Sequence, residues 1–245
     1  MKVPAALVLT LAAASAAFAA PTTTAEPPLV EAVKNGDLAA LKAALAAGAA
    51  VGEKDRYGWT AVMWAVGRGT AAMVRALVDK GADLRPADPP GFDAMIEAAK
   101  GGRADVVSLL ATRGFSCATK DASGVPALAY AAGQSTVETA AALLACKAAV
   151  DARDPKGATP LIRAAQLGGL DVAKYLLGRG AAVDARDNGG YTALMWAAHG
   201  GYTAVAKALL DARADPAISG KDGRTAAVIA KVRGRAAVSA LLPAP

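Results

Sequence analysis

The chain has 245 residues and a formal net charge of +6, and its residues are 54% hydrophobic but only 4% aromatic. That balance predicts a helical stack filled by alanine and leucine and argues against one large aromatic core. A single histidine and two cysteines also exclude a zinc-type ligand cluster and leave no basis for an acid–histidine–nucleophile trio.

The first twenty residues have the pattern of a secretory signal peptide. Lys2 precedes a run of apolar and small residues that ends in Ala17-Phe18-Ala19, a small-x-small motif, and we expect cleavage after Ala19. An uncleaved anchor is the alternative, but the apolar run is shorter than the ~20 residues that a membrane span needs. We therefore expect a signal peptide at 1–19, a polar linker at 20–27, and no membrane span after processing. Loss of Lys2 lowers the net charge from +6 to +5.

From residue 28 onwards the sequence repeats with a period of 33 residues. Each unit holds two short apolar segments at helical spacing, each too short to be stable alone. An alanine column runs through seven copies: Ala32, Ala65, Ala98, Ala131, Ala164, Ala197 and Ala230. A leucine column follows: Leu77, Leu110, Leu143, Leu176, Leu209 and Leu242. We predict an all-α solenoid of about seven helix-turn-helix repeats, near residues 28–54, 55–87, 88–120, 121–153, 154–186, 187–219 and 220–242.

Three further columns indicate how each unit is built. Five units open with aspartate and have glycine three residues later, which is typical of a turn at the tip of a hairpin-like loop: Asp55, Asp88, Asp121, Asp154 and Asp187. Thr or Asp before the first helix can cap it. Glycine between the two helices favours a positive φ: Gly36, Gly69, Gly102, Gly168, Gly201 and Gly234, with Ser135 as the exception. The alanine column indicates that neighbouring first helices approach closely.

The end units are atypical, as a solenoid requires. The first lacks an opening turn, and the last carries Lys231, Arg233 and Arg235 where inner units have small or apolar residues. The region from Arg213 to the end is basic but has no aromatic residue. Nucleic-acid binding would need aromatic platforms beside the basic face, so we interpret this end as a solvated polar cap.

The sequence resembles the ankyrin repeat family in its period of 33 residues and in one motif. The motif is Asp154-Pro155-Lys156-Gly157-Ala158-Thr159-Pro160-Leu161. The resemblance covers roughly residues 28–242. The family often has a histidine after this leucine, whereas here the column is apolar: Val30, Met63, Ile96, Ala129, Ile162, Met195 and Val228. We expect apolar packing to replace the hydrogen bonds of that histidine. The resemblance implies a non-catalytic protein-binding module that uses its turn tips and first helices.

The sequence offers little basis for a catalytic or cofactor site. Gly67-Arg68-Gly69-Thr70-Ala71-Ala72 is similar to a dinucleotide fingerprint, but that fingerprint requires a preceding strand and residues 60–66 are helical by register. We therefore expect no catalytic residue, no cofactor and no metal site. An enzyme with unrecognised chemistry is the alternative of another class, and an activity that survives purification would favour it.

The two cysteines lie in adjacent units. Cys117 shares a column with Leu84, Val150 and Val183, whereas Cys146 lies near the exposed end of a second helix. An exported chain meets an oxidising compartment, so a disulfide is one possibility. The residue stacked on Cys117 by the repeat register is Val150, however, and we expect two free thiols.

Aromatic and basic residues mark the predicted binding surface. They fall at positions that hold no core column, namely one to four or twelve and thirteen residues after each opening residue, on the concave side. The predicted partner-binding residues are Tyr57, Trp59, Arg68, Phe92, Lys100, Lys156, Tyr191 and His199. Trp64, Tyr130 and Trp196 share another column, for which framework packing is the alternative to binding. Trp59 and Tyr191 lie at loop tips, where packing on the next tip is the alternative.

Together these features predict a binding scaffold or regulator in the cell envelope, periplasmic or secreted and monomeric. Its partner is expected to be another protein, and not a nucleic acid. A narrower alternative is an inhibitor or immunity-type protein that blocks the active site of an enzyme.

Overall fold

The computed structural model describes residues 26–85, 93–134 and 136–243, and these form fourteen helices. The predicted signal peptide at 1–19, most of the linker at 20–27, the opening residue Asp88 and the predicted contact residue Phe92 lie outside these ranges. The helices are α1 (Pro28–Lys34), α2 (Leu38–Ala46), α3 (Ala61–Arg68), α4 (Ala71–Val78), α5 (Ala94–Lys100), α6 (Ala104–Thr112), α7 (Ala127–Gly133), α8 (Val137–Ala145), α9 (Pro160–Leu167), α10 (Leu170–Gly178), α11 (Ala193–Gly200), α12 (Thr203–Asp211), α13 (Ala226–Val232) and α14 (Ala236–Ser239).

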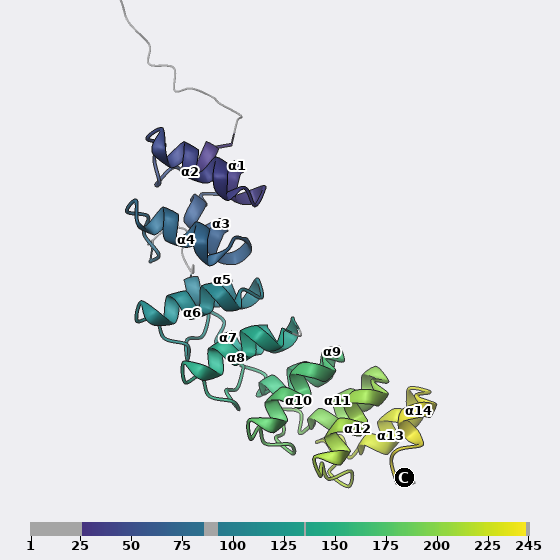
Figure 1. The fold of residues 1–245 in the computed structure, drawn as a ribbon. Coiled ribbons are helices and arrows are strands. Elements are labelled where there is room, and N and C mark those ends of the chain that lie inside the picture. Colours follow the sequence, from purple (N-terminus) through teal and green to yellow (C-terminus); the bar gives the residue numbers. More distant parts are fainter. Residues whose placement is uncertain (1–25, 86–92, 135, 244–245) are drawn as a thin grey trace, which may run out of the picture.

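The helices form antiparallel pairs that stack in chain order into a curved solenoid of seven units (Figure 1). The odd-numbered first helices lie side by side along the inside of the curve, and the even-numbered second helices lie along the outside (Figure 1). Neighbouring first helices contact each other more extensively than neighbouring second helices do, except where α6 meets α8. Closer contacts along the row of first helices bend the stack towards that row. The predicted all-α repeat architecture is thus confirmed, and the first helices lie on its concave face.

The core consists of the columns that the sequence repeats. The alanines between neighbouring first helices are buried, from Ala32 at 5% exposed to Ala230 at 0%. The leucine column is equally buried except at the end, where Leu242 is 8% exposed. The apolar column in place of the family histidine is also buried from Val30 to Met195, with Met63 at 0% and Ile162 at 1%, and Val228 in the last unit is half-buried. Apolar packing therefore replaces the histidine hydrogen bonds, as predicted.

The first helices begin with capping residues. The Thr159 hydroxyl accepts a hydrogen bond from the backbone N–H of Ile162, and Thr192 and Thr225 make the equivalent bond. Asp93, which replaces the threonine, caps α5 in the same way at 3.0 Å from the Ile96 nitrogen. A side-chain acceptor satisfies an N–H that has no partner within the helix, so the caps predicted at these four positions are confirmed. The predicted cap at Thr60 is not, because its hydroxyl makes no such bond.

The turn between the two helices needs glycine for two different reasons. Gly168 has φ of 75°, a left-handed conformation that residues with a Cβ rarely adopt. Gly69 has φ of −82°, so the prediction of a positive φ is wrong there. A Cβ on Gly69 would lie 2.8 Å from the Cα of Ala65, and close backbone approach explains why this position is glycine.

The opening turns are closed by their aspartates. In the fifth unit, one carboxylate oxygen of Asp154 accepts the N–H groups of Lys156 (2.8 Å) and Ala158 (2.9 Å), and the Asp154 N–H donates to the Ala158 carbonyl. Asp55, Asp121 and Asp187 hold their turns in the same way. These contacts confirm the predicted hairpin-like tips.

Basic side chains next to the opening aspartates join one tip to the next. The Arg153 guanidinium donates to the carbonyl of Arg186 (2.7 Å), and Arg186 donates in turn to the carbonyl of Ser219 (2.7 Å). Lys120 makes the corresponding bond to the carbonyl of Arg153 at 3.0 Å. Each bond spans one repeat, so the tips form a continuous row.

The prediction of two free thiols is wrong, because Cys117 and Cys146 form a disulfide with a Cα–Cα distance of 5.9 Å. Repeat register aligns residues 33 positions apart, whereas these two are separated by 29. Cys117 lies in the segment after α6, and Cys146 is the residue that ends α8, so this segment lies beside the end of α8. A loop crossing therefore brings them together, and the bond joins the third and fourth units.

Candidate interaction surface

A hydrogen bond inside each unit fixes the aromatic column of the first helices. The Trp64 Nε1 donates to Oδ2 of Asp55 at 2.9 Å, which is the carboxylate oxygen that does not close the turn. The Trp196 Nε1 donates to Oδ2 of Asp187 at 2.8 Å. Tyr130 and Arg163 make the same bond to the opening aspartates of their own units, at 2.5 and 2.8 Å. These residues therefore have a structural role, which was the alternative to binding given for this column. They orient the tip against the first helix.

The sequence carries a signal for this pairing, since donor and acceptor recur nine residues apart. In the last unit both change together: Gly220 opens the turn and Ile229 occupies the donor position. An unpaired carboxylate or indole N–H in this half-buried place would cost free energy, which explains the joint change in the last unit. In the third unit Glu97 occupies the donor position and pairs with Lys100 instead.

The pairing also sets the ionisation of its members. Burial opposes the charged form of Asp55, but the N–H groups of Trp59 and Trp64 outweigh it and hold the pKa of this carboxyl below its usual value. Burial, together with the hydrogen bond to Asp121, raises the pKa of Tyr130 to about 12. Asp55 is therefore an anion and Tyr130 a neutral donor across the physiological range.

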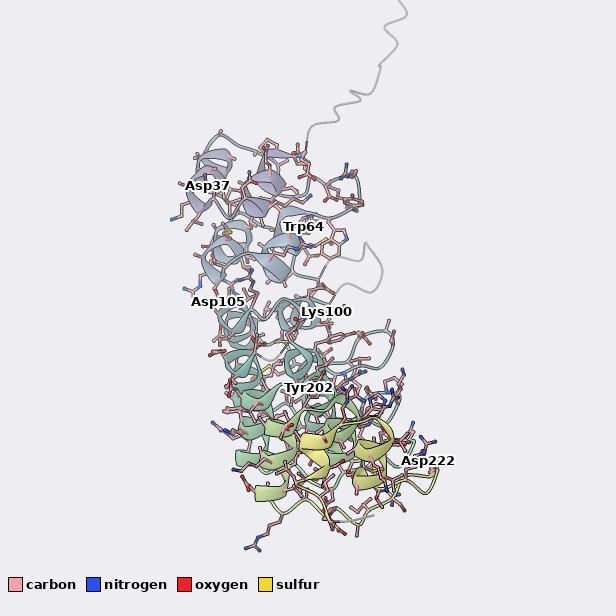
Figure 2. The ribbon with its side chains drawn as sticks, turned by 90° about the vertical axis from the view of Figure 1, so that its right-hand side faces the viewer. Asp37, Trp64, Lys100, Asp105, Tyr202 and Asp222 are labelled. Atoms are coloured by element: carbon pink, nitrogen blue, oxygen red, sulfur yellow. A yellow bond between two sulfur atoms is a disulfide. The ribbon has the colours of Figure 1, made fainter. Side chains whose placement is uncertain are left out.

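A hollow of about 450 Å³ lies on the inner side between the second and third units. Three of the predicted residues line it, Trp59, Arg68 and Lys100. The rings of Trp59 and Trp64 are 5.2 Å apart, and the Arg68 guanidinium lies 4.8 Å from the Trp64 ring. Figure 2 shows Trp64 and Lys100 on neighbouring units, on the side away from Asp37 and Asp105 at the second helices.

Close helix contact forms one edge of this hollow. A Cβ on Gly101 would collide with the carbonyl oxygen of Gly67, so α3 and α5 approach each other there through glycine. Arg103 donates a hydrogen bond to the carbonyl of Arg68, and Asp105 accepts the N–H of Ala71 at 2.8 Å. These bonds join the two units where the first helices end.

Two further hollows lie on the inner side between the fifth and seventh units. The larger, of about 340 Å³, is lined by Lys156, Arg163, Trp196 and His199, and the smaller, of about 150 Å³, by Tyr191, Trp196, His199 and Arg233. They share Trp196 and His199, whose rings are 5.6 Å apart. Three more predicted residues, Lys156, Tyr191 and His199, are therefore gathered here.

The side chain of Tyr191 is more constrained than we expected for a residue at a loop tip. Its ring packs 5.5 Å from that of Trp196, and its hydroxyl donates a hydrogen bond to Asp222 of the next tip. This bond, with burial as the second cause, raises the pKa of Tyr191. Packing on the next tip, the alternative given for this residue, is thus confirmed.

His199 faces a basic neighbourhood. Burial is the largest cause that lowers its pKa, and the charges of Arg233 and Arg235 lower it further. The Arg233 guanidinium contacts the His199 Nε2. At neutral pH the imidazole is therefore uncharged, and its Nε2 can accept a hydrogen bond from the Arg233 guanidinium.

Two predicted residues do not join these clusters. Tyr57 is 60% exposed at its tip, where its ring is stacked with Arg56 at 4.8 Å, and it lines none of the three hollows. Phe92 lies outside the described residues. The predictions missed Glu97, Arg163 and Arg233, although positions nine and thirteen after the opening residue could have identified them.

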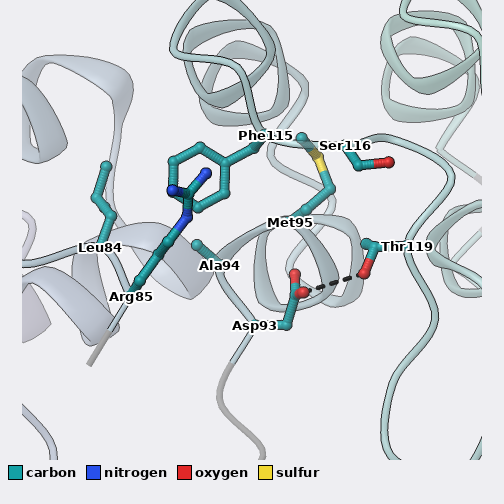
Figure 3. A pocket seen from close by; sticks show the side chains of 8 residues that line it. All are labelled: Leu84, Arg85, Asp93, Ala94, Met95, Phe115, Ser116 and Thr119. Carbon is teal, nitrogen blue, oxygen red and sulfur yellow. Dashed lines mark hydrogen bonds between the residues drawn. The ribbon is translucent and has the colours of Figure 1, made fainter. Parts of the chain in front are cut away.

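A different hollow, of about 250 Å³, lies beside α5 (Figure 3). The oxygens of Asp93 there accept from the Ile96 N–H and from the Thr119 hydroxyl (3.0 Å), and Arg85 lies 4.3 Å from the Phe115 ring. Asp93, Thr119 and Arg85 in this hollow contact other residues of the chain, so we interpret the hollow as part of the packing between units.

Comparison with known proteins gives a family match over most of the chain. The family model of ankyrin repeats in three copies matches residues 29–121 and 113–187, and the model of the single ankyrin repeat matches residues 189–221. No curated protein matches the chain. Within the described ranges, every helix is too short or too polar to cross a membrane. The chain belongs to the ankyrin repeat family, whose repeats serve as scaffolds for protein–protein interaction.

Proposed function

We propose that this protein is a non-catalytic scaffold that binds another protein along its inner surface. The observation that carries this function is the gathering of six aromatic and basic residues into three hollows on one side of the stack. Tryptophan, tyrosine and arginine dominate the residues that contribute most to protein interfaces. The framework hydrogen bonds hold the indoles in place before binding, which reduces the entropy lost on association.

Truncation of the tip aromatics tests this function. Trp59→Ala and Tyr191→Ala should each weaken a partner complex about thirtyfold or more, because a binding hot spot contributes at least ~2 kcal/mol. The complex is captured from cell-envelope extract, identified by mass spectrometry, and its affinity is measured for each variant. Tyr191→Phe belongs in the series, since it removes only the hydroxyl that bonds Asp222.

Lys174→Ala is the matched control, because Lys174 is exposed on the second helix α10. It should leave binding unchanged. Loss of binding in Lys174→Ala, together with normal binding in the tip variants, would place the interface on the outer side of the stack.

We infer further that the scaffold works in the periplasm or is secreted. The leader pattern at 1–19 supports export, and the Cys117–Cys146 disulfide fits an oxidising compartment. The intact mass of protein recovered from the envelope should correspond to a chain that starts at Ala20. Recovery of a species that retains 1–19 would contradict export with cleavage.

A further inference from the structure

Each hollow of the inner surface holds a cation that lacks an anionic partner. Arg68, Lys156 and Arg233 are exposed, and none of them forms an ion pair with another described residue. Arg68 lines the hollow with Trp59 and Trp64, whereas Lys156 and Arg233 line the two hollows that share Trp196. Each unpaired cation is thus accompanied by an indole.

The carboxylates around these hollows have other partners, and none of them forms an ion pair with Arg68, Lys156 or Arg233. Asp154 closes its turn and pairs with Arg163, and Asp187 closes its turn and accepts from Trp196. Glu97 pairs with Lys100 at 2.8 Å, and Asp222 accepts from Tyr191. Three carboxylates, Glu97, Asp154 and Asp187, line the three hollows, against seven cations: Arg68, Lys100, Arg103, Lys156, Arg163, Arg224 and Arg233. The lining therefore carries an excess of positive charge.

The outer surface has a different charge pattern. On two of the second helices a cation has a carboxylate one helical turn away, namely Lys174 with Asp171 and Lys207 with Asp211. Opposite charges at this spacing are neighbours on a helix. On the inner side, Arg68, Lys156 and Arg233 have no ion-pair partner among the described residues.

Apolar side chains lie between the cations. Leu167 at the end of α9 is 56% exposed and Val232 at the end of α13 is 69% exposed. The outermost hollows are four units apart, and neighbouring helices lie 8–10 Å apart, so the surface spans roughly 32–40 Å. An extended chain rises about 3.3 Å per residue, and about ten to twelve residues would cover this distance.

We propose that the partner presents an acidic extended segment to this surface, about ten to twelve residues long, in which carboxylates alternate with apolar side chains. The carboxylates pair with Arg68, Lys156 and Arg233, and the apolar side chains pack on the indoles and on Leu167. The acidic character of the segment deepens the scaffold function proposed above and rests on it.

A peptide titration of the full chain with its disulfide intact tests this assignment. The probe is a synthetic peptide of about twelve residues that repeats Asp-Leu-Glu-Leu, and its neutral control repeats Asn-Leu-Gln-Leu. All three tryptophans of the chain line the hollows, so intrinsic fluorescence reports binding directly. The acidic peptide should bind at least tenfold more tightly than the neutral one, and its affinity should fall as salt is added.

Charge reversal locates the binding. Arg68→Glu and Arg233→Glu should each weaken the acidic peptide about tenfold, because they place like charges opposite each other. Lys174→Glu on the outer surface is the matched control and should leave the affinity unchanged. Melting curves confirm that each variant is folded.

Equal affinity for the two peptides, or an equal loss in Lys174→Glu, would overturn the acidic assignment. Tighter binding of single-stranded RNA than of the acidic peptide would overturn it as well. If Trp59→Ala abolishes capture of the native partner while Arg68→Glu and Arg233→Glu retain it, the scaffold function stands and the acidic segment is wrong. If the tip variants capture the partner normally, binding along the inner surface, on which both proposals rest, is wrong.

Discussion

Leu176→Ala should lower the free energy of unfolding by roughly 2–5 kcal/mol, as expected for truncation of a fully buried leucine. Leu176 is 0% exposed in α10, in the fifth of seven units. Helix α10 contacts α8 on one side and α12 on the other, besides α9 of its own unit. The cavity would therefore weaken two inter-unit interfaces at once. Denaturant melts of the two proteins give the difference.

Leu242→Ala is the matched control at the end of the same column. Leu242 is 8% exposed in the last unit, which has a neighbour on one side within the described residues. The loss should be smaller than for Leu176→Ala, because the stability of a solenoid is approximately a sum of unit and nearest-neighbour contributions. Equal losses in the two variants would contradict this description.

Removal of the disulfide should lower the free energy of unfolding by about 3–4 kcal/mol. The bond closes a loop of 29 residues, and chain entropy for a loop of this length predicts a loss of that size. The variant to compare with the oxidised chain is Cys117→Ser combined with Cys146→Ser, melted without reductant. A thiol titration of the denatured, non-reduced chain should find no reactive thiol.

The single change Cys146→Ser distinguishes the contribution of the disulfide to stability from that of side-chain packing. Cys146 is only half-buried, whereas Cys117 is 3% exposed, so the single change disturbs the packing less. It should lose nearly as much stability as the double variant. Two reactive thiols per denatured, non-reduced chain, or unchanged melting after reduction, would show that the bond does not form in solution.

The repeat pattern by itself determined the architecture. A unit of two short helices cannot bury its apolar face alone, so a fixed period with conserved spacing of Ala, Leu, Gly and Asp leaves stacking as the stable arrangement. The same register identified the caps of α5 and α9, the closed turns at Asp55 and Asp154, and the side of the stack on which the variable residues lie.

Tertiary structure decided what register alone does not encode. Repeat alignment compares residues 33 positions apart, but contacts also form where loops cross, and this is how Cys117 reached Cys146. The same limit explains Tyr191, which alignment placed as a free tip residue although its hydroxyl reaches Asp222 of the next tip.

The candidate site shows the same division. The sequence placed Arg68, Lys100, Lys156 and His199 on one side of the stack, because their positions within the repeat fix their direction. Only the folded chain shows which of them gather in one hollow and which cations keep a carboxylate partner. Curvature sets the spacing between units, and ion pairing depends on distances of a few ångströms between side chains, so both arise from packing across units and not from the pattern within one.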